Sequence, residues 1–193
     1  MKILRNFLVV IPIIIALCLT ACGDNNESFK SVKTEPTQST VPSSEPNLDQ
    51  PCSLVDAQTA ATLLKVPLEK INEPDVTQGN DFLKCRYDAL SDDNELFIAF
   101  NIYIFKSKDA FDRVNSANDG KSINTELDGG FSYIRANKRE SERFVGAYQG
   151  DIRIGISASI ALTQPKGELK SEQIILPSLE ELATQVGLVI SKL

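Results

Sequence analysis

A change of composition near residue 50 limits the part of this chain that can build a packed core. Asparagine, serine, threonine, glutamate and proline dominate residues 23–50, which contain few apolar side chains. Such a segment cannot bury enough apolar surface to offset the entropy lost on ordering, so we expect a flexible, partly extended tether. Residues 51–193 remain, and their number is normal for one domain with its own core.

The first 21 residues have the pattern of an export signal. Lys2 and Arg5 give a positive start, and residues 7–17 are almost purely apolar. This run is shorter than the roughly 20 apolar residues that span a membrane, so it predicts a cleaved signal peptide. The following sequence, Leu19-Thr20-Ala21-Cys22, resembles the lipobox of bacterial lipoproteins. That resemblance implies cleavage before Cys22 and acyl chains on this cysteine.

Lipid on Cys22 would decide where the protein resides. One buried acyl chain binds a membrane only marginally, whereas two or more give stable anchoring. The resemblance therefore implies a membrane partner through a lipid anchor on the bacterial cell envelope, outside the cytoplasm. Gly23 stands where an aspartate would favour inner-membrane retention, which points to the outer membrane if the cell has two. The alternative is an ordinary signal peptide with a chance cysteine.

These observations divide the chain into three parts. We predict a lipoprotein signal peptide over 1–21, a lipidated cysteine and its tether over 22–50, and a single globular domain over 51–193. Cys52 and Cys85 are the only cysteines in that domain. Because exported proteins fold in an oxidising compartment, this pair predicts a disulfide bond. In the chain-entropy model it would stabilise the domain by roughly 3–4 kcal/mol.

The charge balance and the residue types argue against several functions. The chain has 26 acidic and 20 basic residues, and its net charge is −6 at pH 7, so its overall field does not attract nucleic acid. It has no histidine, which excludes Ser-His-Asp and Cys-His nucleophile systems. Two cysteines without histidine also make a metal site unexpected. We therefore predict no cofactor and no enzyme, with an envelope enzyme that uses carboxylates or a Ser/Lys pair as the alternative.

Capping residues and apolar periodicity predict a domain of the α+β class. Asp56, Ser107 and Ser178 can cap helices that extend to residues 64, 117 and 193. Alternating or continuous apolar runs predict strands over 82–90, 96–105, 131–136, 144–149 and 152–160. The order is α-β-β-α-β-β-β-α, which predicts a largely antiparallel sheet of about five strands with packed helices.

Two short motifs carry a resemblance to a known family. Pro51-Cys52-Ser53-Leu54 precedes the first predicted helix, and Cys85-Arg86-Tyr87 lies on the strand that follows it. Together they resemble an uncharacterised family of small bacterial lipoproteins whose disulfide domains open with Pro-Cys-Ser-Leu and return with Cys-x-Tyr. The family has no established activity. With the anchor, this resemblance implies an envelope lipoprotein, and we predict a non-catalytic binding or accessory module for an envelope protein, peptide or glycan.

The last two predicted strands define a candidate binding patch. If Gly150-Asp151 is a two-residue loop, Gln149 pairs with Ile152 and the register follows outward. One face of the hairpin is then apolar core, and the other carries the patch: Phe144, Gly146, Tyr148, Arg153, Gly155 and Ser157. Gly146 would face Gly155 and leave a dent, with Arg153 stacked on Tyr148. Either a helix, such as 178–193, covers this dent, or the dent is a shallow groove for an extended peptide or glycan.

Overall fold

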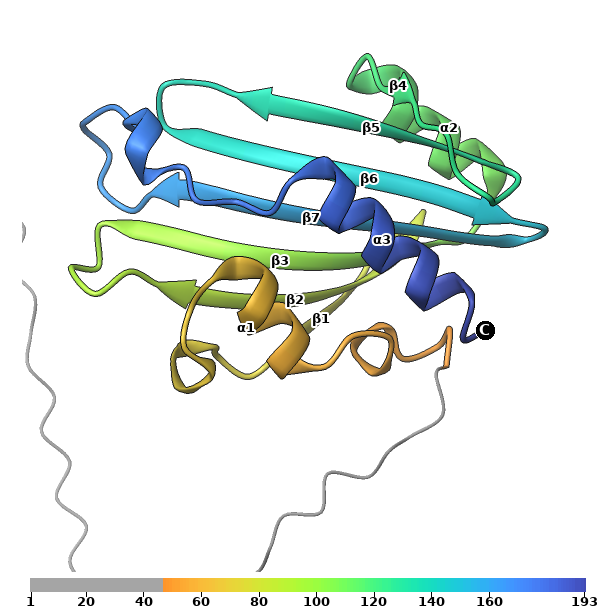
Figure 1. The fold of residues 1–193 in the computed structure, drawn as a ribbon, viewed down its shortest axis with the longest axis horizontal. Coiled ribbons are helices and arrows are strands. Elements are labelled where there is room, and N and C mark those ends of the chain that lie inside the picture. Colours follow the sequence, from red (N-terminus) through yellow and green to blue (C-terminus); the bar gives the residue numbers. More distant parts are fainter. Residues whose placement is uncertain (1–46) are drawn as a thin grey trace, which may run out of the picture. The chain divides into compact units, whose positions relative to one another are not determined.

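A single antiparallel sheet organises residues 47–193, the part of the chain that this computed structural model describes (Figure 1). The predicted signal peptide, Cys22 and most of the predicted tether lie outside these described residues. Between residues 47 and 193, no helix is long and apolar enough to cross a membrane.

Seven strands form the sheet, in the order β1-β2-β3-β7-β6-β5-β4. The strands are β1 (Asp75–Gln78), β2 (Phe82–Leu90), β3 (Leu96–Phe105), β4 (Lys121–Ser122), β5 (Gly129–Ala136), β6 (Glu140–Gln149) and β7 (Ile152–Leu162). The helices are α1 (Ala57–Leu64), α2 (Lys108–Ala117) and α3 (Leu179–Ile190), and short 3-10 turns occupy η1 (Pro51–Ser53), η2 (Leu68–Lys70) and η3 (Ser171–Gln173). Every neighbouring pair of strands is antiparallel.

The α+β class and the largely antiparallel sheet are confirmed, but the predicted number of about five strands is wrong. The two missed strands, β1 and β4, have four and two residues and lie at the two edges of the sheet. All of their residues are exposed, so neither strand has the buried, alternating side chains that make a strand visible in a sequence. β1 and β4 are strands only because they pair with β2 and β5, respectively.

The two faces of the sheet have different cores. On the first face, apolar side chains such as Phe100, Val145 and Ile156 pack against α1 and α3, which both lie in front of the sheet in Figure 1. On the second face, Phe105, Phe131 and Phe144 pack with Ala110 and Phe111 of α2. We call the first the helical face and the second the aromatic face.

The predicted caps begin all three α-helices. The Asp56 carboxylate accepts a hydrogen bond from the Thr59 amide at 2.7 Å, and the Ser107 hydroxyl accepts one from Ala110 at 3.1 Å. At α3, Ser178 and Glu181 form a reciprocal capping box. The hydrogen bonds from Thr59 hold the pKa of the Asp56 carboxyl below its ordinary value. The local sequence therefore sets where each helix begins, and tertiary packing determines which side of the helix is buried.

The predicted disulfide is present and joins the start of the domain to β2. Cys52 in η1 is bonded to Cys85, and their Cα atoms are 5.1 Å apart. Cys85 is completely buried. The Tyr87 hydroxyl reinforces this connection by donating to the Val55 carbonyl at 2.7 Å. Residues 51–55 are thus held against the helical face by a covalent bond and a buried hydrogen bond.

Candidate functional site

The hairpin that carries the predicted patch has the expected register. Gln149 pairs with Ile152 around the Gly150-Asp151 turn, and Gly146 lies directly opposite Gly155. The apolar side of the hairpin, including Val145 and Ile154, belongs to the core of the helical face. The patch residues consequently lie on the aromatic face.

Aromatic rings fill the dent between the two glycines. A Cβ atom added to Gly155 would lie 2.6 Å from the ring of Phe144 and 3.0 Å from that of Phe105. A Cβ added to Gly146 would lie 2.9 Å from the ring of Phe111, which α2 supplies. The prediction that a helix over 178–193 covers the dent is therefore wrong, because α3 packs on the opposite face and α2 closes this one.

Most of the predicted patch is consequently buried. Phe144, Gly146, Gly155 and Ser157 are buried, and only Tyr148 and Arg153 are partly exposed. The predicted groove for an extended peptide or glycan is thus closed at the glycine pair. Any recognition surface on this face must lie elsewhere along the strands.

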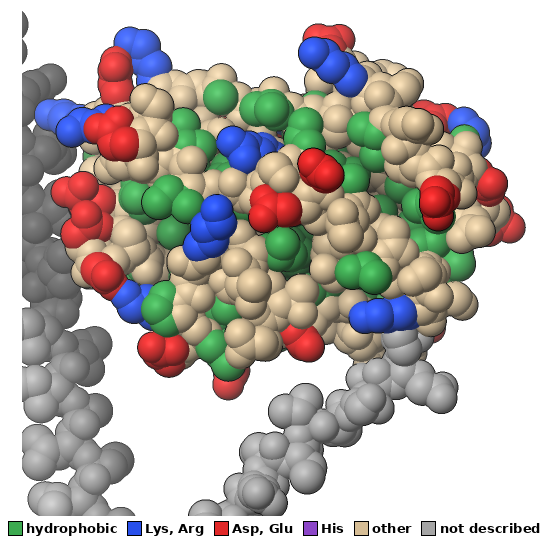
Figure 2. Space-filling view, viewed as in Figure 1, with side chains coloured by type: hydrophobic (Ala, Val, Ile, Leu, Met, Phe, Trp, Pro, Cys, Tyr) green, Lys and Arg blue, Asp and Glu red, His purple; other side chains and the backbone are tan. Residues whose placement is uncertain are grey.

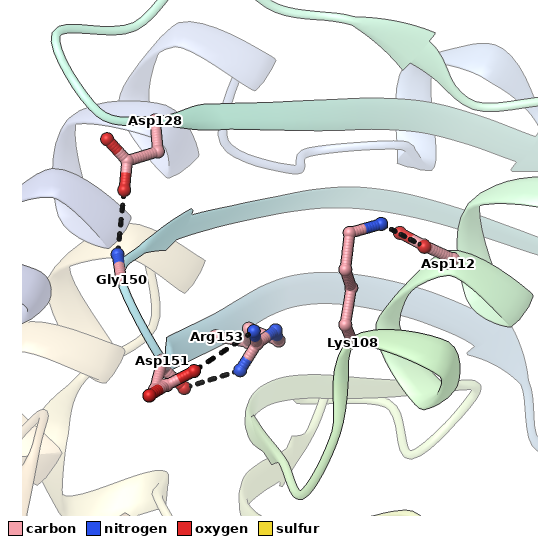
Figure 3. Close-up of polar contacts among 6 residues, drawn as sticks. All are labelled: Lys108, Asp112, Asp128, Gly150, Asp151 and Arg153. Carbon is pink, nitrogen blue, oxygen red and sulfur yellow. Dashed lines mark hydrogen bonds and ion pairs between the residues drawn. The ribbon is translucent and has the colours of Figure 1, made fainter.

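Arg153 does not form the predicted stack on Tyr148. Its guanidinium donates to the Asp151 carbonyl at 2.6 Å and also faces the Asp151 carboxylate (Figure 3). Tyr148 instead meets the ring of Phe111 edge to face, with 5.9 Å between the centroids. In the same turn, the Gly150 amide donates to the Asp128 carboxylate at 2.7 Å. At this end of the hairpin, the Arg153 guanidinium and the Gly150 amide are therefore bonded within the protein.

Further along the aromatic face, two rows of the sheet carry polar side chains. The register places Arg86, Asn101, Ser157, Phe144 and Tyr133 in one row, and Asp88, Ala99, Ser159, Glu142 and Arg135 in the next. Phe97 follows Ala99 on the same face, because side chains alternate along a strand. We call these positions, except the buried ring of Phe144, the polar half of the aromatic face.

Among residues 47–193, no helix packs over the polar half. The helices α1 and α3 contribute to the helical-face core, and α2 buries Ala110 and Phe111 within the aromatic cluster. In the middle of the polar half, Asn101, Ala99 and Ser157 are buried, and Ser159 is partly exposed. The larger side chains stand on either side of them, on β2 and on β5–β6.

Two ion pairs flank the small side chains. Arg86 Nε lies 3.0 Å from Asp88 Oδ2, and Arg135 Nη2 lies 2.8 Å from Glu142 Oε2. Both carboxylates are only 13% exposed, although a single layer of side chains covers this part of the sheet. The buried atoms Arg86 Nε and Glu142 Oε2 lack a hydrogen bond of good geometry within the described residues. These are the atoms that make the two ion pairs, so each buried charge is offset by its partner although the hydrogen-bond geometry is poor.

Neutral polar groups and aromatic rings complete the polar half. Asn101 Nδ2 donates to Ser157 Oγ at 3.1 Å. The Tyr133 ring stacks on Phe144 with 4.9 Å between centroids, and the Arg86 guanidinium lies 5.7 Å from the centre of the Phe97 ring. Burial, and secondarily the Glu142 carboxylate, raises the pKa of the Tyr133 hydroxyl above its ordinary value. The same carboxylate is the hydrogen-bond partner of that hydroxyl.

A hollow lies on the helical side of the molecule. Its volume is about 470 Å³, and it separates α3 from the segment 123–127, with Gly187 of α3 and Leu127 on its walls. Charged side chains of both signs are scattered over this side without forming one patch (Figure 2). Among the described residues, no group of three or more histidine, cysteine, aspartate or glutamate side chains could hold a metal ion. The polar half is therefore the stronger candidate site.

Sequence reasoning found the correct face of the hairpin but missed the residues that β2, β3 and β5 add to it. Two signals were present. Arg86 and Asp88 alternate with buried Cys85 and Tyr87, and Asn101 is the lone polar residue in an otherwise apolar strand. Only the cross-strand register, however, shows that these residues lie beside Ser157 and Glu142.

Comparison with known proteins adds little to this description. No protein-family model matches the chain, and no curated protein matches it. Among solved structures, the extracellular domain of PknH from Mycobacterium tuberculosis is similar, with a TM-score of 0.36 and 7% identity. The match covers 75% of this chain and 97% of that domain.

Proposed function

We propose that this chain is a lipid-anchored lipoprotein of the bacterial cell envelope and that residues 51–193 form a non-catalytic binding or accessory module. Two features support the location. The sequence that ends at Cys22 resembles a lipobox, and the Cys52–Cys85 disulfide suits a protein that folds in an oxidising compartment. The uncharacterised lipoprotein family with the same two cysteine motifs has this organisation as well.

The proposal that this domain binds a ligand rests on the polar half of the aromatic face. Glu142 and Asp88 are mostly withdrawn from water beside small side chains, in a region without a covering helix among residues 47–193. Desolvated charges of this kind are weak contributors to stability and are common at functional surfaces. A ligand on this surface would contact the exposed parts of Arg86 and Arg135, which lie on either side of the buried Ala99 and Ser157.

The anchor has a direct test. Cys22→Ala is expected to release the chain from the membrane fraction or leave it unprocessed, because the acyl chains supply the attachment. Fractionation of cells and mass spectrometry of the N-terminal peptide measure both effects. Cys18→Ala is the matched control, since Cys18 precedes the cleavage point and is removed with the signal. An unmodified Cys22 in the native protein, with unchanged membrane partitioning, would contradict the anchor.

The binding surface is tested by photo-crosslinking in intact cells. Replacing Phe97 with p-benzoylphenylalanine places the probe at the polar half and keeps an aromatic side chain. The matched control is the same replacement at Ile175, which is 54% exposed and precedes α3. We expect a crosslinked envelope component, identified by mass spectrometry, from position 97 and not from position 175. Equal crosslinking at both positions, or none at position 97, would remove the support for this surface.

A further inference from the structure

Gly187, inside α3, has no packing role within residues 47–193. At each of the other glycines there, either φ is positive or an added Cβ atom would lie 3.2 Å or less from another residue. Gly187 lies in regular helix, and an added Cβ atom would meet nothing within 4 Å. Glycine weakens a helix relative to alanine, so a destabilising residue occupies a position where alanine would fit. Departures of this kind from local rules are expected at functional sites.

The bare backbone at Gly187 borders the hollow on the helical side. Ala183 and Ser191 lie four residues before and four residues after Gly187 in the chain, and all three line the hollow. Because these residues are small, the space between this flank of α3 and the segment 123–127 stays open. Its volume is about 470 Å³, and sites for small ligands have volumes of about 300–1,000 Å³. The hollow is therefore large enough for a small molecule.

Apolar groups make most of the lining. Val145 and Ala147 of β6 are buried at its base, and Ile123 and Leu127 lie on the wall opposite α3. Ile123, Leu127 and Gly187 are only partly buried, so their apolar surfaces are accessible from solvent. Contact with an apolar group would remove these surfaces from water, which is favourable.

Glu126 is the only charged residue that lines the hollow. Its side chain is exposed, and it forms no ion pair with any residue between 47 and 193. The other polar lining residues, Asn124, Thr125, Thr184 and Ser191, are neutral. Charge complementarity therefore favours a ligand with a positive charge and disfavours an anion.

We propose that the hollow between α3 and the segment 123–127 binds a small organic amine. The apolar body of the amine packs on Leu127 and on the backbone of Gly187, where a longer side chain would take its place. Its ammonium group lies beside the Glu126 carboxylate. The hollow is on the helical face, opposite the polar half, so this inference does not rest on the proposed function.

Titration of the full lipidated chain with three matched probes tests the inference. The probes are 2-phenylethylamine, the neutral 2-phenylethanol and the anionic 3-phenylpropionate. The protein is held in a zwitterionic detergent, and binding is followed by amide NMR shifts. We expect the amine to shift amides of 123–127 and 183–187 and to bind more tightly than the alcohol. The anion is expected to leave these amides unshifted.

A variant that fills the hollow assigns the binding to it. Gly187→Leu has room for its Cβ atom and extends an apolar side chain into the space, so we expect the amine no longer to shift amides of 123–127. Ser116→Leu is the matched control, because it adds the same side chain at an exposed position of α2 and should leave binding unchanged. Circular dichroism verifies that both variants fold.

A second variant tests the selection by charge. Glu126→Gln keeps the shape of the side chain and is expected to weaken binding of the amine about two- to fivefold, the range for an exposed ion pair. Binding of the alcohol should not change. Glu168→Gln is the control, because it removes a carboxylate from the exposed pair with Lys138 and should leave the affinity for the amine as it is.

Three results would each overturn the inference. The first is that the amine does not shift amides of 123–127 and 183–187. The second is that the anion binds as tightly as the amine. The third is that folded Gly187→Leu, or Glu126→Gln, binds the amine as tightly as the native chain does. None of these results bears on crosslinking from position 97, so the proposed function stands or falls separately.

Discussion

Replacing Cys52 and Cys85 together with alanine is expected to lower the free energy of unfolding by about 3–4 kcal/mol. The two cysteines are 33 residues apart in sequence, so the bond closes a long loop. In the chain-entropy model, opening that loop gives the unfolded chain more conformations and stabilises it relative to the native state. Small proteins have a total stability of only about 5–15 kcal/mol, so this loss is large.

A matched variant separates the covalent bond from the contacts beside it. Tyr87→Phe removes the hydroxyl that donates to Val55 and leaves the disulfide intact. We expect it to cost about 1–3 kcal/mol, because the Val55 carbonyl becomes unsatisfied in a buried place. Urea unfolding followed by circular dichroism measures both changes, since the chain has no tryptophan for fluorescence. If the double cysteine variant loses less free energy of unfolding than Tyr87→Phe does, the disulfide does not have the structural role described.

Local signals in the sequence were sufficient for the main elements of this fold. The bounds predicted for α1, β2, β3 and α2 match the structure residue by residue, because each element begins or ends at a cap, a turn or a change of periodicity. The register of the β6–β7 hairpin followed from the two-residue turn at Gly150-Asp151. Edge strands β1 and β4 have no such signal, and they exist only through their partners.

The site was less accessible to sequence reasoning, for a physical reason. The glycine pair correctly indicated a close approach on one face of the hairpin, but a sequence does not show which side chain makes that approach. Phe144 makes it from within the hairpin and Phe111 makes it from α2. The polar half depends on side chains from five strands, and their pairing order is a property of the tertiary structure. The β6–β7 hairpin supplies only four of the ten positions in the two rows, Phe144 and Ser157 in one and Glu142 and Ser159 in the other.

Two glycine-to-alanine substitutions are expected to change stability in opposite directions. At Gly155, the new Cβ would lie 2.6 Å from the ring of Phe144, far inside normal contact. That ring cannot move aside easily, because it is 2% exposed and stacked between Phe131 and Tyr133. Overpacking of a dense core costs typically 1–3 kcal/mol, so Gly155→Ala should destabilise the protein by about that amount and Gly155→Val by more.

At Gly187 the same chemical change meets no obstacle. A Cβ there finds no atom within 4 Å, and the residue lies inside α3, where glycine is about 0.5–1 kcal/mol less favourable than alanine. Gly187→Ala should therefore raise the free energy of unfolding by up to that amount. Urea unfolding of the two variants beside the native chain measures the difference between them. If Gly155→Ala leaves stability unchanged, the rings of Phe144 and Phe105 do not fill the dent, and the packing of the aromatic face is not as described.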